Sequence, residues 1–281
     1  MTDSEEIKLA IQSVIKEMMD QVMDNALIKK PFMPDKHRAF KPLYAALVPD
    51  EIFKGSHFER KFVTPFGGVW EKLAIVAIQK GLGCGLRQHT IQGTVKAERL
   101  RRITERLNIL EHGLEYRQSG QPRIKPNWNE ELSYILEGNG EDIPVTVICD
   151  VYAEDTKSGE KYSFEIKAPL PNSDQTKVSK EKILKLYSME PKKIDEAYFA
   201  LPYNPYGQKE NYRWTVPNRW FNMKEDKVVL IGDEFWEKIG GVGTYQAFIN
   251  AVNEIGQEYK YRIYKEFLGI EPPAGTQDFT L

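Results

Sequence analysis

Two apolar, β-branched runs in the middle of the chain set its architecture. They lie at residues 143–152 (IPVTVICDVY) and 162–168 (YSFEIKA), and a short polar turn that contains glycine (DTKSGEK) separates them. Two such runs across a short polar loop are typical of an antiparallel β-hairpin. We therefore predict a hairpin here, in a chain whose remaining pattern is largely helical.

The segments around the hairpin predict a mixed α/β fold. Residues 4–25 carry apolar side chains at spacings of three and four, which indicates an amphipathic helix. Further helices are expected at residues 39–47, 68–80, 96–111, 177–186, 233–238 and 244–267, and buried strands at 196–201 and 227–231. A glycine-rich stretch (GLGCG) is expected to end the helix at residue 80. This order predicts a central mixed β-sheet flanked by helices, with a helical N-terminal part.

The composition fits a globular protein with a real core. The chain has 281 residues, of which 41% are hydrophobic and 11% aromatic, and this excludes disordered and collagen-like classes. No long linker divides it, so we expect one domain over residues 1–281, helical to about residue 60 and with its core at 61–281. Its two cysteines argue against a disulfide framework. With no long apolar run and an acidic N-terminus, the expectation is a soluble, cytoplasmic protein without a membrane partner.

The charge of the chain is uneven although its balance is nearly neutral. The net charge of −2 gives no indication of nucleic acid. Lysine and arginine nevertheless crowd residues 96–106 and 177–193. Each segment is either a solvated helix face or a surface that serves a neighbouring site.

The residues that carry chemistry lie on the predicted hairpin. Asp150 ends the first run, and Glu165 and Lys167 flank Ile166 on the second. Because side chains alternate across a strand, Glu165 and Lys167 share one face, which Asp150 can reach if the hairpin pairs near its turn. Paired carboxylates suit Mg²⁺, and a lysine can orient or help deprotonate a metal-bound water. The cluster therefore predicts phosphodiester hydrolysis.

Spacing alone leaves a second interpretation open. Acid-x-Lys triplets also begin at Glu6, Glu59, Asp155, Glu190, Glu225 and Glu258. The triplet at Glu165 differs because it lies inside an apolar strand, behind a second strand that carries an acid. The alternative is a solvated strand face on which Glu165 and Lys167 form ordinary surface charges.

Three stretches resemble a known nuclease superfamily. Asp150 together with FEIK (Phe164–Lys167) resembles the PD-(D/E)xK nuclease motif, although Cys149 stands where that motif has proline. The continuation APLPNSDQTK resembles type II restriction endonucleases of the TdeIII-like kind. FVTPFGGVWEKLA (residues 62–74) resembles the N-terminal helix of such enzymes, and KVVLIGDEFWEKIGG (residues 227–241) the late strand and helix of those that cut GG/CC-type sites. The resemblance thus extends from residue 62 to residue 241.

This resemblance implies a restriction-endonuclease-like fold and a type II restriction endonuclease. Such an enzyme hydrolyses double-stranded DNA at specific sequences and leaves 5′-phosphates, with Mg²⁺ as its cofactor and Mn²⁺ as a substitute. The resemblance assigns the metal to Asp150, Glu165 and Ile166, and the positioning of the water to Lys167. Glu71 is expected to orient Lys167 or the water shell of the metal.

The same resemblance assigns DNA contacts to the basic and polar residues after the motif. A DNA-reading loop is expected near residues 203–225, because arginine, lysine, asparagine and glutamine read base edges and phosphates. The expected contacts are Asn172, Gln175, Lys177, Lys180, Asn204, Gln208, Asn211, Arg213 and Arg219. For any one of them, a plain polar or packing role is nearly as good an interpretation.

The expected partners are a short GC-rich palindrome in double-stranded DNA and a second copy of the chain. The helices at residues 4–25 and 244–267 are candidates for the homodimer interface, unless they pack on the core of their own subunit. A DNA methyltransferase is expected to be encoded nearby. Two other functions remain open, namely a DNA repair or junction-resolving nuclease of the same fold and a non-catalytic DNA- or protein-binding module.

Overall fold

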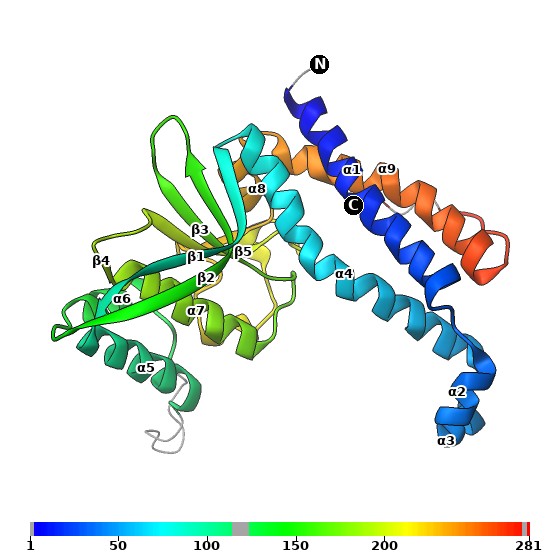
Figure 1. Cartoon of the computed structure of the whole chain (residues 1–281), viewed down its shortest axis with the longest axis horizontal. Coiled ribbons are helices and arrows are strands. Elements are labelled where there is room, and N and C mark those ends of the chain that lie inside the picture. Colours follow the sequence, from blue (N-terminus) through cyan, green and yellow to red (C-terminus); the bar gives the residue numbers. More distant parts are fainter. Residues whose placement is uncertain (1–2, 114–123, 277–279) are drawn as a thin grey trace. The chain divides into compact units, whose positions relative to one another are not determined.

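The computed structural model describes residues 3–113, 124–276 and 280–281 (Figure 1). The chain forms two compact units, one from Met1–Val76 with Gly243–Leu281 and the other from Ala77–Val242. We call these the helical unit and the sheet unit. Their boundary falls inside helix α4 (Asp50–Lys80) and not near residue 60, and the C-terminal segment returns to the helical unit. Within the described part of the chain, none of the helices combines the length and hydrophobicity needed to cross a membrane.

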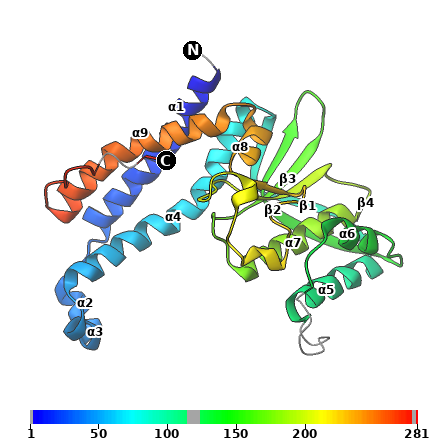
Figure 2. The same cartoon turned by 180° about the vertical axis from the view of Figure 1, so that it is seen from behind.

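The helical unit is built around two helices from opposite ends of the chain. Helix α1 (Asp3–Asp24) lies along α9 (Thr244–Arg262), as Figures 1 and 2 show. Most of the predicted apolar stripe of α1 is buried, and Tyr259 donates a hydrogen bond to Asp20 at 2.5 Å. The apolar faces of α1 and α9 are therefore used inside the chain. This supports packing on their own subunit, and not the dimer interface that we had considered for them.

The connecting segments of this unit differ from the predicted helix at residues 39–47. Two π-helices, η1 (Asn25–Lys29) and η4 (Ile263–Leu268), extend α1 and α9. Two short helices, α2 (Pro34–Phe40) and α3 (Pro42–Leu47), replace the single predicted one. Each begins at a proline, which suits the first turn of a helix but interrupts a helix interior.

Helix α4 is much longer than the predicted helix at residues 68–80. It runs through Pro65 and both glycines of the PFGG sequence. Phe66 packs its ring against Phe62 at 5.3 Å and against Trp70 at 5.0 Å between ring centroids. Val69 and Trp70 are buried. This packing outweighs the local helix-breaking tendency, because most helical stability in proteins comes from tertiary contacts.

The sheet unit contains a six-stranded mixed sheet. Its strands are β1 (Gly83–Lys96), β2 (Asp142–Asp155), β3 (Lys161–Ile166), β4 (Met189–Glu190), β5 (Glu196–Leu201) and β6 (Val229–Ile231). Their order is β4-β1-β2-β3-β5-β6. The pairs β4–β1, β1–β2 and β2–β3 are antiparallel, whereas β3–β5 and β5–β6 are parallel. The expected α/β class with a central mixed sheet is confirmed, and so is the β2–β3 hairpin.

Strand β1 was not predicted. The glycine-rich stretch expected only to end a helix continues into this strand, which pairs with β2 from Gly83 opposite Asp155 to Lys96 opposite Asp142. Only Ile91 and Val95 of β1 are buried, so the strand shows little hydrophobic alternation. Its conformation comes from pairing with a strand that lies far along the chain.

Helices cover the sheet on both faces. The main core joins Cys149 of β2 and Phe199 of β5 to α5 (Ala97–His112), α6 (Trp128–Leu136) and α7 (Ser173–Ser188). On β3, Phe164 packs against Tyr198 at 5.5 Å and against Phe235 of α8 (Asp233–Gly240) at 5.8 Å. Strand alternation therefore turns Phe164 toward α8 and its neighbour Glu165 toward α7.

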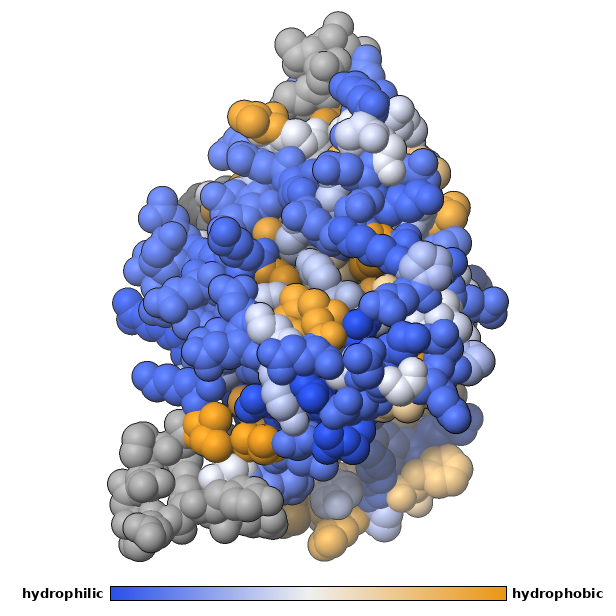
Figure 3. Space-filling view, turned by 90° about the vertical axis from the view of Figure 1, so that its left-hand side faces the viewer, coloured by the Kyte–Doolittle hydropathy of each residue, from blue (hydrophilic) through white to orange (hydrophobic). Residues whose placement is uncertain are grey.

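The outer surface is mainly hydrophilic on the side shown in Figure 3, which is the left-hand side of Figure 1. Hydrophobic residues form small separate groups in that view. On the long strands, Leu86 is 45% exposed and Ile148 is 48% exposed. Scattered exposure of this kind is ordinary for protein surfaces and needs no partner.

Candidate active site

The hairpin brings Asp150, Glu165 and Lys167 together. Asp150 lies on β2, Glu165 lies on β3, and Lys167 follows the last residue of β3. The Nζ atom of Lys167 lies 2.6 Å from Oδ2 of Asp150 and 3.4 Å from Oε2 of Glu165. Asp150 Oδ2 also accepts a hydrogen bond from the backbone N–H of Ile166 at 2.9 Å. The geometry that we expected from strand alternation is present, and the catalytic roles of the three residues remain predictions.

Burial makes the charges of this cluster interdependent. The side chain of Glu165 is only 1% exposed, against 15% for Asp150. Burial and the neighbouring charge of Asp150 raise the pKa of Glu165, while Lys167 and Lys182 pull it down. Burial also lowers the pKa of Lys167, but the charges of Glu165 and Asp150 outweigh that effect and raise it. The two carboxylates therefore favour the ammonium form of Lys167, which donates hydrogen bonds to them.

A second lysine contacts the buried carboxylate. Lys182 on α7 donates hydrogen bonds to Oε1 of Glu165 at 2.9 Å and to Oε2 at 3.0 Å. The sequence offered Lys182 only as one member of a basic run. No local pattern marks it, because the face of α7 that meets the sheet is set by long-range packing. Lys182 is a missed residue of the site.

The oxygens around Lys167 fit a divalent cation. Besides the two carboxylates, its Nζ lies 3.2 Å from the carbonyl oxygen of Ile166, so three oxygens converge on one positive charge. No group of three or more His, Cys, Asp or Glu side chains that could hold a metal is present in the described ranges. Two carboxylates, one carbonyl and several waters are a set that Mg²⁺ accepts. The residues present therefore fit the expected metal.

Two of the expected DNA contacts, Lys180 and Asn204, are buried in the structure. Lys180 is completely buried, forms an ion pair with Glu131 of α6 and donates a hydrogen bond to the carbonyl of Trp220. Asn204 is 3% exposed, donates to the carbonyl of Gln208 at 2.8 Å and accepts from the backbone N–H of Tyr206 at 3.0 Å. Buried polar groups need such partners, so both side chains are used inside the fold, and this favours a structural role over the expected DNA contact.

The other expected contacts lie at or near the surface. The exposed ones are Asn172, Gln175, Gln208, Asn211 and Arg213, and Lys177 and Arg219 are partly buried. Asn172 caps α7 by accepting from the N–H of Gln175 at 2.8 Å, and Lys177 is paired with Glu111. Their roles in DNA binding remain predictions.

The expected DNA-reading loop is fastened to the segment after the motif. Tyr212 donates to the carbonyl of Pro169 at 2.9 Å, and Trp214 donates through Nε1 to the carbonyl of Pro171 at 2.9 Å. Trp220 donates through Nε1 to Ser173 at 3.1 Å. Since residues 169–173 follow Lys167 directly, these three aromatic side chains connect the loop to the cluster.

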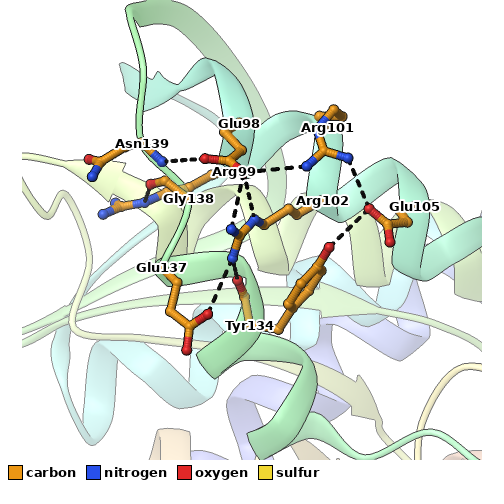
Figure 4. Close-up of polar contacts among 9 residues, drawn as sticks. All are labelled: Glu98, Arg99, Arg101, Arg102, Glu105, Tyr134, Glu137, Gly138 and Asn139. Atoms are coloured by element: carbon orange, nitrogen blue, oxygen red, sulfur yellow. Dashed lines mark hydrogen bonds and ion pairs between the residues drawn. The ribbon is translucent and has the colours of Figure 1, made fainter.

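Arg99, Arg101 and Arg102 of the basic segment at residues 96–106 contact neighbouring groups (Figure 4). Arg106 instead lies over the ring of Tyr134, 4.2 Å from its centroid. Arg102 contacts Glu98 at 3.0 Å and donates to the carbonyl of Tyr134, and Arg101 bridges Glu98 and Glu105 at 3.3 and 3.1 Å. Arg99 donates to the carbonyl of Gly138 at 3.0 Å. This network joins α5 to α6 and to the turn before β2, so its role is structural.

Glu71 lies on α4 in the helical unit, and its expected role beside Lys167 stays a prediction.

Comparisons with known proteins identify the family of the chain. A family model described as type II restriction endonuclease, HinfI, matches residues 7–256. The type II restriction enzyme HgiEI of Herpetosiphon aurantiacus is 26% identical over 81% of each chain, and HgiBI of the same organism is 25% identical over 85% of each. A third enzyme from that organism, HgiCII, is 25% identical over 81% of this chain and 82% of its own. The match covers both units, and the chain belongs to the HinfI family of type II restriction endonucleases.

Proposed function

We propose that this site-specific endodeoxyribonuclease uses Mg²⁺ at Asp150 and Glu165 to cut a short GC-rich palindrome, leaving 5′-phosphates. The observation that carries the metal assignment is the position of Lys167 Nζ between the two carboxylates and the carbonyl of Ile166. The GC-rich palindrome rests on the likeness of residues 227–241 to enzymes that cut GG/CC-type sites.

Each residue of the cluster has a distinct task in this proposal. Asp150, Glu165 and the carbonyl of Ile166 would hold the metal, which neutralises phosphate charge and makes a bound water more acidic. Lys167, as an ammonium group, donates hydrogen bonds that orient the attacking water or a phosphate oxygen. Lys182 compensates the charge of Glu165 from the side of α7. Mn²⁺, which takes the same oxygen ligands, should substitute.

Cleavage of both strands at a palindrome is most simply done by two such clusters. The described residues contain one Asp150–Glu165–Lys167 cluster, and a palindrome has a two-fold axis that two identical subunits can match. We therefore propose a homodimer, with an interface that does not use the mutually covered apolar faces of α1 and α9. A nearby gene for a methyltransferase would protect the cell's own DNA.

Plasmid cleavage tests the proposal directly. With Mg²⁺, the wild-type protein should convert plasmid into a discrete set of fragments whose 5′ ends can be ligated without added phosphate. Asp150→Asn, Glu165→Gln and Lys167→Ala should each lower the rate at least about a hundredfold. Glu258→Gln and Lys260→Ala alter a matched acid-x-Lys triplet on α9 and should cut normally. Near wild-type cleavage by any of the three site variants would contradict the assignment, and preferential cutting of branched or damaged DNA would favour a repair nuclease.

A further inference from the structure

A second basic surface lies in the helical unit. Lys30 follows η1, Lys36 lies in α2, Lys41 separates α2 from α3, and Arg60 and Lys61 lie in α4. All five line a cavity of about 480 Å³. Lys30, Arg60 and Lys61 also line an adjoining cavity of about 460 Å³. We call this surface the Lys30–Lys61 groove.

The five cations of the groove form no ion pair with an acidic side chain of the described residues, whereas Lys29, which also lines the larger cavity, is paired with Asp24 at 2.6 Å. None of the described residues that line the two cavities is Asp or Glu. In the other two basic segments, by contrast, Arg102 is paired with Glu98 and Lys177 with Glu111. Neighbouring like charges repel one another, so the groove is suited to an anionic partner.

The floor of the groove is a packed aromatic layer. His37 lies 4.1 Å from Phe53 between ring centroids, and Phe32 lies 5.9 Å from His57. His57 Nε2 is 2.8 Å from the carbonyl oxygen of Lys30, which links α4 to the segment after η1. The five cations therefore lie on chain segments that these contacts hold together, namely the segment after η1, the α2–α3 region and α4.

We propose that the Lys30–Lys61 groove binds the phosphate backbone of double-stranded DNA, a role that rests on the proposed DNA-cleaving function. Five cations spread over three segments suit a row of phosphates better than one small anion. Exposed lysine and arginine side chains contact phosphates without reading bases, so the groove adds affinity and not sequence choice. Phe40 and Leu43 beside it are 77% and 70% exposed, which makes a protein partner the competing outcome.

Salt-dependent binding of a labelled duplex of arbitrary sequence tests this role. The full-length variant Lys30→Ala/Lys36→Ala/Arg60→Ala removes three exposed groove cations. The matched control Lys8→Ala/Lys16→Ala/Lys265→Ala removes three cations of the same unit that are paired with glutamates. Without Mg²⁺, the slope of log affinity against log salt should fall by about three for the groove variant, since each lost phosphate contact removes about 0.9. The control should keep the wild-type slope.

The outcomes separate this inference from the proposed function. If the wild-type protein cuts plasmid while the groove variant and the control bind duplex with the wild-type slope, the groove does not bind DNA and the nuclease assignment stands. An unchanged slope with an altered oligomeric state in light scattering would assign the groove to a protein interface instead. Equal loss of slope in both variants would also overturn the proposal, because it would show only a general charge effect. A wild-type protein that neither binds duplex nor cuts plasmid would refute the proposed function itself.

Discussion

Lys182 of α7 donates one hydrogen bond to each carboxylate oxygen of Glu165, at 2.9 and 3.0 Å. This contact places a second positive charge on a carboxylate that already lies near Lys167. Glu165 is almost fully buried, and its pKa is raised by burial and by Asp150. Lys182 works against both effects, so it helps to keep Glu165 ionised and able to bind a cation.

Replacement of Lys182 should therefore shift the acidic limb of the cleavage profile. In Lys182→Met, one of the charges that lower the pKa of Glu165 is gone, so this carboxyl stays protonated to a higher pH. The pH at which cleavage reaches half its maximum should rise, while the rate well above that pH should change less. Lys185→Met, which removes the partner of Glu181 on the same helix, is the matched control. Identical profiles for the two variants would show that Lys182 does not act through Glu165.

Mg²⁺ should stabilise the protein in the absence of DNA by binding to the carboxylates of Asp150 and Glu165. A ligand that binds only the folded state adds about 2.7 kcal/mol when its concentration is a hundred times its dissociation constant. Thermal unfolding of the wild-type protein without DNA should thus move to higher temperature as Mg²⁺ is added. Asp150→Asn and Glu165→Gln should lose this response, and Glu258→Gln should keep it. A full response in either site variant would place the metal elsewhere.

The pH dependence of stability should report the buried glutamate in the absence of metal. Because the pKa of Glu165 is raised in the folded state, the folded protein binds this proton more tightly than the unfolded chain does. This contribution is present at low pH and is lost as pH rises through the folded-state pKa. Glu165→Gln has no such proton to lose. The unfolding free energy of the variant should therefore rise relative to that of the wild type as pH increases over that window. A difference that stays constant from acid to neutral pH in denaturant titrations would contradict the shift.

Lys180 should prove to be a stabilising residue and not a DNA contact. It is paired with Glu131 inside the core, and removal of one partner of a buried pair costs about 3–5 kcal/mol. Lys180→Met should lower the free energy of unfolding by an amount of this order in denaturant titrations. The double variant Glu131→Gln/Lys180→Met removes both charges but keeps an acceptor for the N–H of Asn127, so it should recover most of the loss. A Lys180→Met variant that keeps the wild-type stability but shows a smaller slope of log DNA affinity against log salt would contradict this prediction.

The contrast between Lys180 and Lys182 shows where inference from sequence stops. The two lysines are two residues apart on α7. Lys180 is completely buried and pairs with Glu131 of α6, whereas Lys182 pairs with Glu165. The hairpin was predictable because its two strands and its turn are neighbours in the chain, and alternation then places Asp150 near Glu165. The environment of each α7 lysine is decided by distant residues such as Glu131. Strand β1 was missed for a similar reason, since it is held by pairing with β2 and its own sequence is rich in glycine.

The aromatic anchors of the loop should control selectivity more than general DNA binding. Trp214→Phe keeps an aromatic ring but removes the donor that bonds the carbonyl of Pro171, and Tyr212→Phe does the same at Pro169. A hydrogen bond of this kind contributes about 0.5–1.5 kcal/mol, so each variant should lower cleavage of the preferred site about twofold to tenfold. Affinity for duplex of arbitrary sequence should hardly change, because phosphate contacts are kept. Tyr44→Phe, which alters an exposed tyrosine of α3, is the control for loss of a hydroxyl. If the loop variants lose affinity for all duplexes equally, or cut the preferred site at the wild-type rate, the connection between this loop and the cluster has no role in site choice.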